Sequence, residues 1–128
     1  MPIATANSPL RVLVIGASYG LLPAAKIAAA GHSVTVVGRI DEVASIARDG
    51  VEIEFSPEHI LRPPMSDAGL SFSIPDTVDP TAFNLVLLAI VEPQVRSTEI
   101  CNLLKRINEK VPVASIMNMP PPPYLARI

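Results

Sequence analysis

Residues 10–39 read LRVLVIGASYGLLPAAKIAAAGHSVTVVGR, and this stretch decides the fold. It opens with a continuous apolar run, Arg11–Ile15, which is typical of a strand buried on both faces of a parallel sheet. The alanine-rich segment 20–30 has the composition of a helix that ends at Gly31. A second apolar run, Ser33–Val37, predicts a parallel neighbour for the first strand. The order strand, glycine turn, helix and strand predicts a βαβ unit.

The rest of the chain continues this alternation, with one interruption. Residues 56–83 contain five prolines, which break any long element and leave room for only a short strand at 71–74. The other predicted elements are a helix at 41–48 capped by Asp41, a strand with one wet face at 51–55, a strand at 84–90, a helix from Pro93 to about 108, and a strand at 113–117. Together they predict an α/β fold, a Rossmann-like doubly wound and mainly parallel sheet with helices on both faces.

We divide the chain into three parts. Residues 1–9 are expected to be a flexible N-terminus, and 10–119 a Rossmann-like dinucleotide-binding domain. Residues 120–128 form a proline-rich tail, in which four consecutive prolines impose an extended polyproline conformation. We expect this tail to link to a C-terminal domain that lies outside the chain.

The composition argues against several classes of partner. The chain is 49% hydrophobic and 17% charged with a net charge of -2, so we expect no nucleic-acid partner. No apolar run reaches the roughly 18 residues of a membrane span, and the N-terminus does not have the pattern of a signal peptide. The single cysteine, Cys101, is expected to be a buried, reduced thiol, and we expect a cytoplasmic protein with no metal site. The sequence leaves the oligomeric state open, with a homodimer as one alternative.

The glycines of the loop depart from the dinucleotide fingerprint Gly-x-Gly-x-x-Gly. Gly16 follows the first strand directly and fits the tight turn. Gly20 stands at the helix start and fits the role of the third glycine if the loop is one residue short. Ser18 then takes the middle position, where its hydroxyl can donate to a phosphate but its Cβ crowds the approach. The alternative is a tight turn that binds no nucleotide.

Arg39 follows the second strand, where NAD-specific proteins place an Asp or Glu on the ribose hydroxyls. There is no acidic residue at that strand end. The planar, permanently charged guanidinium of Arg39 instead suits a 2′-phosphate, and this predicts NADP as the cofactor. The alternative is an ordinary surface arginine.

Three stretches resemble the N-terminal domain of the ketopantoate reductase family, which is grouped with the 6-phosphogluconate-dehydrogenase-like NADP proteins. They are RVLVIGASYG…AAAGHSVTVVGR, FNLVLLAIVEPQV and VPVASIMNMPP. The similarity spans roughly 10–120 and is poorest over 56–83. It implies a Rossmann domain that binds NADPH, a following helical domain that closes over the substrate, and hydride transfer to a small keto acid.

The resemblance also implies roles for individual residues. Those implied to bind the cofactor are Gly16, Ala17, Ser18, Tyr19 and Gly20 around the pyrophosphate, Arg39 on the 2′-phosphate, Ala89, Ile90 and Val91 near the nicotinamide ribose, Gln94 toward the adenine, and Asn118 near the nicotinamide. Asn118 is also the implied catalytic residue. Val91 stands where the family often carries a lysine, and the family's catalytic lysine and substrate-binding acid belong to the second domain. We therefore expect these residues alone to bind cofactor and reduce nothing.

Two other functions fit parts of the pattern. GASYGLL is similar to the GASxGIG loop of short-chain dehydrogenases, but Leu22 replaces the last glycine. Neither Tyr19 nor Tyr124 has the lysine four residues later that this group requires. The other alternative is a non-catalytic nucleotide sensor or degenerate Rossmann interaction domain.

Overall fold

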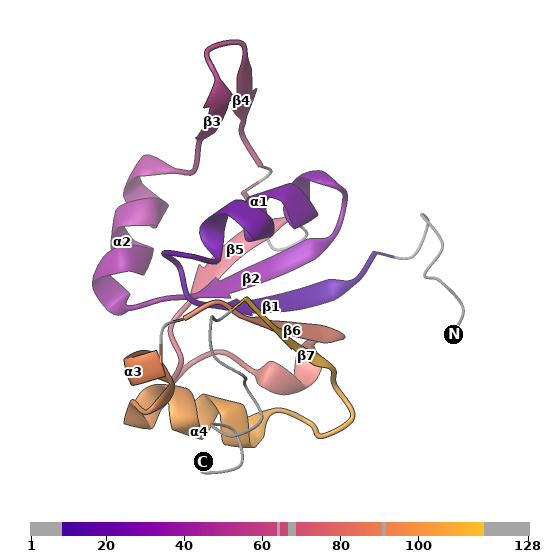
Figure 1. The fold of residues 1–128 in the computed structure, drawn as a ribbon, viewed down its shortest axis with the longest axis vertical. Helices are drawn as coiled ribbons and strands as arrows, with labels where there is room; N and C mark the ends of the chain where they lie inside the picture. Colours follow the sequence, from indigo (N-terminus) through magenta and orange to yellow (C-terminus); the bar gives the residue numbers. More distant parts are fainter. Residues whose placement is uncertain (1–8, 64, 67–68, 91, 117–128) are drawn as a thin grey trace.

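The chain forms a five-stranded parallel sheet in the order β5-β2-β1-β6-β7. The computed structural model in Figure 1 describes residues 9–63, 65–66, 69–90 and 92–116. The strands of the sheet are β1 (Arg11–Ile15), β2 (Ser33–Val37), β5 (Leu70–Ser73), β6 (Leu85–Leu88) and β7 (Val113–Ser115). From β1 in the centre, the chain moves outward through β2 and β5, then returns and moves outward on the other side through β6 and β7. This order confirms the predicted doubly wound sheet.

Helices cover both faces of the sheet, α1 on one and α4 on the other (Figure 1). The helices are α1 (Leu21–Ala29), α2 (Ile40–Asp49), α3 (Glu92–Val95), α4 (Thr98–Arg106) and the short 3₁₀ helix η1 (Pro80–Ala82). Successive side chains of β1 point to opposite faces. Val12 and Val14 pack in the layer that contains Ala24 and Ala28 of α1, whereas Leu13 and Ile15 pack with Leu103 of α4. The continuous apolar run of β1 therefore contributes side chains to the hydrophobic core on both faces of the sheet.

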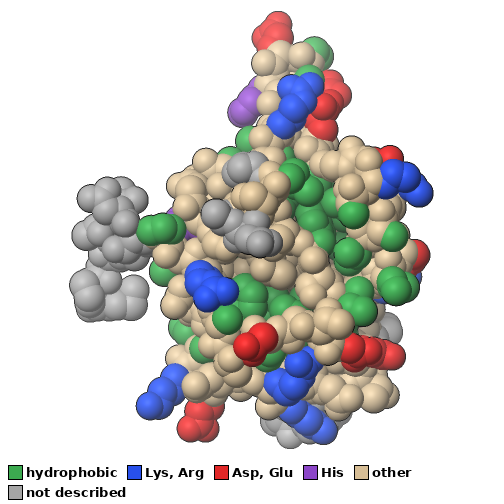
Figure 2. All heavy atoms as spheres, turned by 180° about the vertical axis from the view of Figure 1, so that it is seen from behind, with side chains coloured by type: hydrophobic (Ala, Val, Ile, Leu, Met, Phe, Trp, Pro, Cys, Tyr) green, Lys and Arg blue, Asp and Glu red, His purple; other side chains and the backbone are tan. Residues whose placement is uncertain are grey.

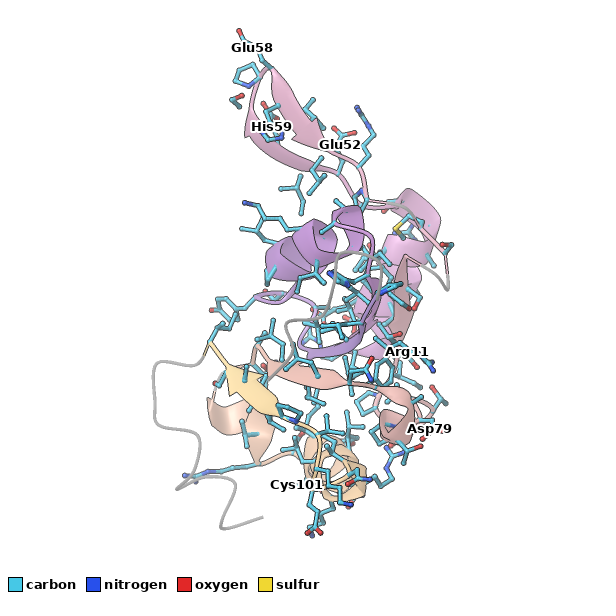
Figure 3. All side chains as sticks on the ribbon, turned by 90° about the vertical axis from the view of Figure 1, so that its right-hand side faces the viewer. Arg11, Glu52, Glu58, His59, Asp79 and Cys101 are labelled. Carbon is cyan, nitrogen blue, oxygen red and sulfur yellow. The ribbon has the colours of Figure 1, made fainter. Side chains whose placement is uncertain are left out.

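The strand predicted at 51–55 does not join the main sheet. The observed strand, β3 (Ile53–Ser56), pairs antiparallel with β4 (His59–Leu61), which was not predicted. Figure 1 shows this hairpin projecting from the body, and Figure 3 shows Glu58 at its tip. Alternating charged residues explain its position, because a strand with one wet face cannot be buried inside a parallel sheet. The edge position next to β2 goes to β5, which matches the short strand predicted at 71–74.

Two predicted helices differ from those observed. The helix predicted at 41–48 begins at Ile40, and its N-cap is Arg39, so Asp41 lies in the first turn and is not the cap. The helix predicted from Pro93 to about 108 is divided into α3 and α4. The division occurs because Ser97 caps a new helix, its Oγ accepting a hydrogen bond from the backbone N–H of Ile100 at 3.4 Å.

Several predictions about the ends of the chain lie outside the described residues. These are the flexible N-terminus up to residue 8, the last residue of the strand predicted at 113–117, and the proline-rich tail. Within the described part, no helix is long and apolar enough to cross a membrane. Figure 2 shows the face opposite to that of Figure 1, where hydrophobic side chains gather beneath the hairpin and charges of both signs are scattered around them.

Two side chains complete the hydrogen bonding at the start of β1. His32 accepts a hydrogen bond at its Nδ1 from the backbone N–H of Leu10, at 2.9 Å. Asn84 accepts one at its Oδ1 from the backbone N–H of Arg11, at 2.8 Å. His32 lies just before β2 and Asn84 just before β6, so each neighbouring strand contributes one acceptor to the central one. His32 therefore has a structural role at the start of β1.

We predict that His32→Ala lowers the free energy of unfolding by about 1 kcal/mol, because it leaves the half-buried Leu10 N–H without an acceptor. Urea denaturation of the variant and of wild type measures this difference. His59→Ala, at an exposed position of the hairpin outside the main sheet, is the control and should cost less. An equal loss in both variants would contradict the role assigned to His32.

Candidate functional site

A cavity of about 490 Å³ opens at the carboxyl ends of the central strands. It lies where β1 and β6 are neighbours and their following helices leave to opposite faces, the usual ligand position in a doubly wound sheet. Eight of the residues predicted to bind cofactor line it: Gly16, Ala17, Ser18, Tyr19, Arg39, Ala89, Ile90 and Gln94. The structure thus brings together residues from the ends of three strands. Val91 and Asn118, also predicted for the site, lie outside the described residues.

Gly16 occupies a position that no other residue can take without strain. Its φ of +118° is in the region that favours glycine. A Cβ there would press against the carbonyl oxygen of Ala89 and lie 2.7 Å from Cγ2 of Ile90. The N–H of Gly16 donates to the carbonyl of Val37 at 2.9 Å, which ties the turn to the end of β2. Gly16 is therefore needed both for the turn and for the close approach of the neighbouring strand.

Gly20 packs the start of α1 against β1. It is the N-cap of α1, and its N–H donates to the carbonyl of Gly16 at 3.0 Å. A Cβ at this position would press against that carbonyl and against Cγ1 of Val14. This close packing of helix on strand is the role of the third glycine in the fingerprint, achieved here with a loop shorter by one residue. Gly20 itself is buried and does not line the cavity.

The turn between these glycines exposes hydrogen-bond donors to the cavity. Among the described residues, none accepts a hydrogen bond from the backbone N–H groups of Ala17, Ser18 or Tyr19. The first N–H groups of α1 follow directly, and the N-terminus of a helix carries a partial positive charge. Backbone donors and a helix N-terminus at the mouth of a cavity are suited to an anion such as a phosphate.

Arg39 lies at the end of β2 beside two carboxylates. Its side chain is 70% exposed, and its Nε is 3.4 Å from Oε1 of Glu42 and 3.6 Å from Oδ1 of Asp41. The same Oε1 of Glu42 accepts the backbone N–H of Arg39 at 3.0 Å. Glu42 also lines the cavity. Sequence reasoning found no acidic residue at the strand end and missed Glu42, although its third position in α2 is typical of a capping box.

The segment that follows β5 forms another wall of the cavity, in addition to the loop after β1 and the residues after β2. Ile74, Pro75 and Asp76 line the cavity there, and sequence reasoning missed them because the segment is rich in prolines. Arg106 of α4 fixes this wall from outside. Its guanidinium donates to the carbonyl of Val78 at 3.0 Å and to that of Pro75 at 2.6 Å.

Asp79 stabilises the next turn of the same segment. Its carboxylate accepts hydrogen bonds from the hydroxyl of Thr81 at 2.6 Å and from the backbone N–H of Thr81 at 3.0 Å, and these bonds lower the pKa of Asp79. The contribution to stability is therefore present above the unfolded-state pKa of an aspartate and is lost as the pH falls through the lowered value. Figure 3 shows Asp79 near Arg11, whose positive charge acts in the same direction.

Polar side chains line the α4 side of the cavity. Ser97 and Glu99, from the start of this helix, line the cavity together with Gln94. Arg39 is the only basic residue among the described residues that line it. Within the same described part, no three His, Cys, Asp or Glu side chains gather in a way that could hold a metal ion.

Comparison with known proteins gives one family match. The family model described as Ketopantoate reductase PanE/ApbA matches residues 12–118. No curated protein matches the chain. Among solved structures, the co-crystal structure of WbdD with the kinase inhibitor LY294002 aligns over 88% of this chain and 25% of that one, with 16% identity and a TM-score of 0.47. The chain thus spans a quarter of the length of that protein.

We predict that Arg106→Met lowers the free energy of unfolding by about 2 kcal/mol, because the charge-assisted hydrogen bonds to the carbonyls of Val78 and Pro75 are lost, together with a longer one within α4 to the carbonyl of Asn102. Chemical denaturation measures the change. Lys105→Met, at the exposed neighbouring position on α4, is the matched control and should stay within about 0.5 kcal/mol of wild type. Equal stability of Arg106→Met and wild type would contradict the role of Arg106 in fixing the wall.

Proposed function

The chain belongs to the ketopantoate reductase family, and on this premise we propose that it is the NADP(H)-binding domain of an oxidoreductase that transfers hydride to a 2-keto acid or a related carbonyl. The observation that carries the proposal is the contact between Gly16 and the residue that follows β6, next to a cavity lined by Arg39 and by backbone N–H groups that have no acceptor among the described residues. The cavity thus lies where ligands bind in doubly wound sheets, between strands whose following helices pack on opposite faces, and it has groups that suit an anion.

The residues of the loop fit the pyrophosphate of a dinucleotide. The N–H groups of Ala17, Ser18 and Tyr19 and the N-terminus of α1 would neutralise the diphosphate charge. Gly38 supports the same fit, because a Cβ there would lie 2.8 Å from the Cβ of Ala17 and would force the two loops apart. The loops after β1 and β2 are thus held close together along one side of the cavity.

The adenosine half of the cofactor would lie toward β2 and β5. Gln94 lies in α3 after β6, on the other side of β1, so the role toward the adenine that the resemblance implies for Gln94 does not fit this placement. Ile74 and Pro75 present apolar surface on which a planar base can pack, and Ile40 stands 73% exposed at the start of α2 nearby. Arg39 would bind the 2′-phosphate with its exposed guanidinium, which is the basis for choosing NADP(H) over NAD(H).

The nicotinamide half would lie toward β6. Ala89 and Ile90 line this end of the cavity and are buried, so they would exclude water from one side of the ring. When bound, the cofactor supplies the hydride, and the protein orients it. Asn118 remains our proposal for the polar group near the ring, and a small keto acid remains our proposal for the substrate.

One observation favours a second function, a non-catalytic nucleotide-sensing domain. The described residues that line the cavity include no lysine or histidine to protonate a carbonyl oxygen. NADPH oxidation by the full-length protein with ketopantoate and other small 2-keto acids distinguishes the two functions. Tight binding of cofactor without turnover of any of them would favour the sensor.

We predict that wild type binds NADPH more tightly than NADH and that Arg39→Ala weakens NADPH binding about tenfold or more, because a charge-assisted hydrogen bond contributes about 1.5–3 kcal/mol. Calorimetric titration with both cofactors measures this. Arg48→Ala is the matched control, because Arg48 is exposed and acid-paired like Arg39 but lies at the far end of α2. Equal affinities of wild type for the two cofactors would refute the role of Arg39.

We also predict that Ser18→Gly preserves or tightens cofactor binding, because it removes the Cβ nearest to the expected pyrophosphate path. Gly16→Val should abolish binding, since its side chain collides with the backbone of Ala89 and cannot adopt the required φ without strain. Circular dichroism shows whether each variant is folded, and NADPH fluorescence measures the affinity. A folded Gly16→Val variant that binds normally would place the phosphate site elsewhere.

A further inference from the structure

The cavity holds a carboxylate at the place where the proposed 2′-phosphate would bind. Glu42 lines the cavity and lies 3.4 Å from the guanidinium of Arg39. We propose that Glu42 is a specificity-determining residue, which limits the preference for a dinucleotide with a 2′-phosphate over one with a free ribose hydroxyl. This inference rests on the proposed function.

The position of the Glu42 carboxylate is fixed by the start of α2. Its Oε1 accepts the backbone N–H of Arg39 at 3.0 Å, and the side chain is 26% exposed. Asp41 also pairs with Arg39, but its side chain is 72% exposed and can turn into solvent. A phosphate that approaches Arg39 can therefore displace Asp41, whereas Glu42 stays in place because its movement would leave an N–H of the helix cap unpaired.

The fixed carboxylate acts in opposite directions on the two cofactors. A 2′-phosphate brings negative charge next to Glu42 and competes with it for the guanidinium of Arg39, and both effects weaken binding. A free 2′-hydroxyl has no charge and can donate a hydrogen bond to a carboxylate, as it does in NAD-specific Rossmann sites. Arg39 favours NADP(H) over NAD(H), and Glu42 makes this difference in affinity smaller.

Glu42→Gln tests this inference with little change of shape. The amide oxygen can still accept the N–H of Arg39, so the helix cap is kept while the charge is removed. We expect the ratio of the dissociation constants for NADH and NADPH to rise about fivefold relative to wild type. Fluorescence titrations with NADPH and NADH measure the ratio, and thermal unfolding of the variant shows whether the fold is kept.

Two variants are matched controls. Glu99→Gln removes the same charge from the same cavity, but at the start of α4 on the other face of the sheet, and it should leave the ratio within about twofold of wild type. Asp41→Asn removes the more exposed carboxylate and should change the ratio less than Glu42→Gln does. A ratio that stays the same or falls in a folded Glu42→Gln variant would overturn the inference, as would an equal rise in Glu99→Gln. Failure of wild type to bind either cofactor would instead refute the proposed function.

Discussion

The structure depends on one close contact between two backbones. At the carboxyl ends of the two neighbouring central strands, the α-carbon of Gly16 lies so near the carbonyl of Ala89 that no side chain fits between them. The N–H of Ala89 donates to the carbonyl of Ile15 at 2.8 Å, so β1 and β6 stay paired up to the point where the chain turns away. Because side chains are excluded there, the cavity can begin directly at the strand ends.

The same contact explains how a loop one residue shorter than Gly-x-Gly-x-x-Gly still packs the start of α1 close to β1. Once Gly16 turns the chain, its carbonyl accepts the N–H of Gly20, and α1 begins after a single tight turn. The packing of Gly20 on Val14 brings the first turn of α1 close to the sheet. Ser18 lies between them on the exposed side of the turn, where a side chain costs nothing to the fold and affects only what approaches the cavity.

The sequence predicts best the parts of the fold in which burial is complete. β6 is an uninterrupted apolar run, β1 is apolar after Arg11, and β2 is apolar except for Ser33 and Thr35. Such runs are typical of strands that are covered on both faces of a parallel sheet. β5 is only weakly predicted, since its sequence LSFS is half polar and the hydroxyl of Ser71 lies 3.1 Å from that of Thr35 across the strands. The hairpin partner β4 is only three residues long, too short for a periodic pattern, and it pairs outside the main sheet. Its pairing depends on a turn that neither periodicity nor composition predicts.

The sequence predicts the charged residues of the site less completely. Arg39 is found from its place after β2, but the environment of its guanidinium depends on where α2 begins. If Asp41 were the cap, Glu42 would be the first residue of the helix and would not occupy the third position of a capping box. The observed start at Ile40 makes Glu42 the third residue of the helix, and its carboxylate reaches back to the N–H of Arg39. A shift of one residue in a helix start therefore decides whether the cation of this site acts alone or beside a fixed negative charge.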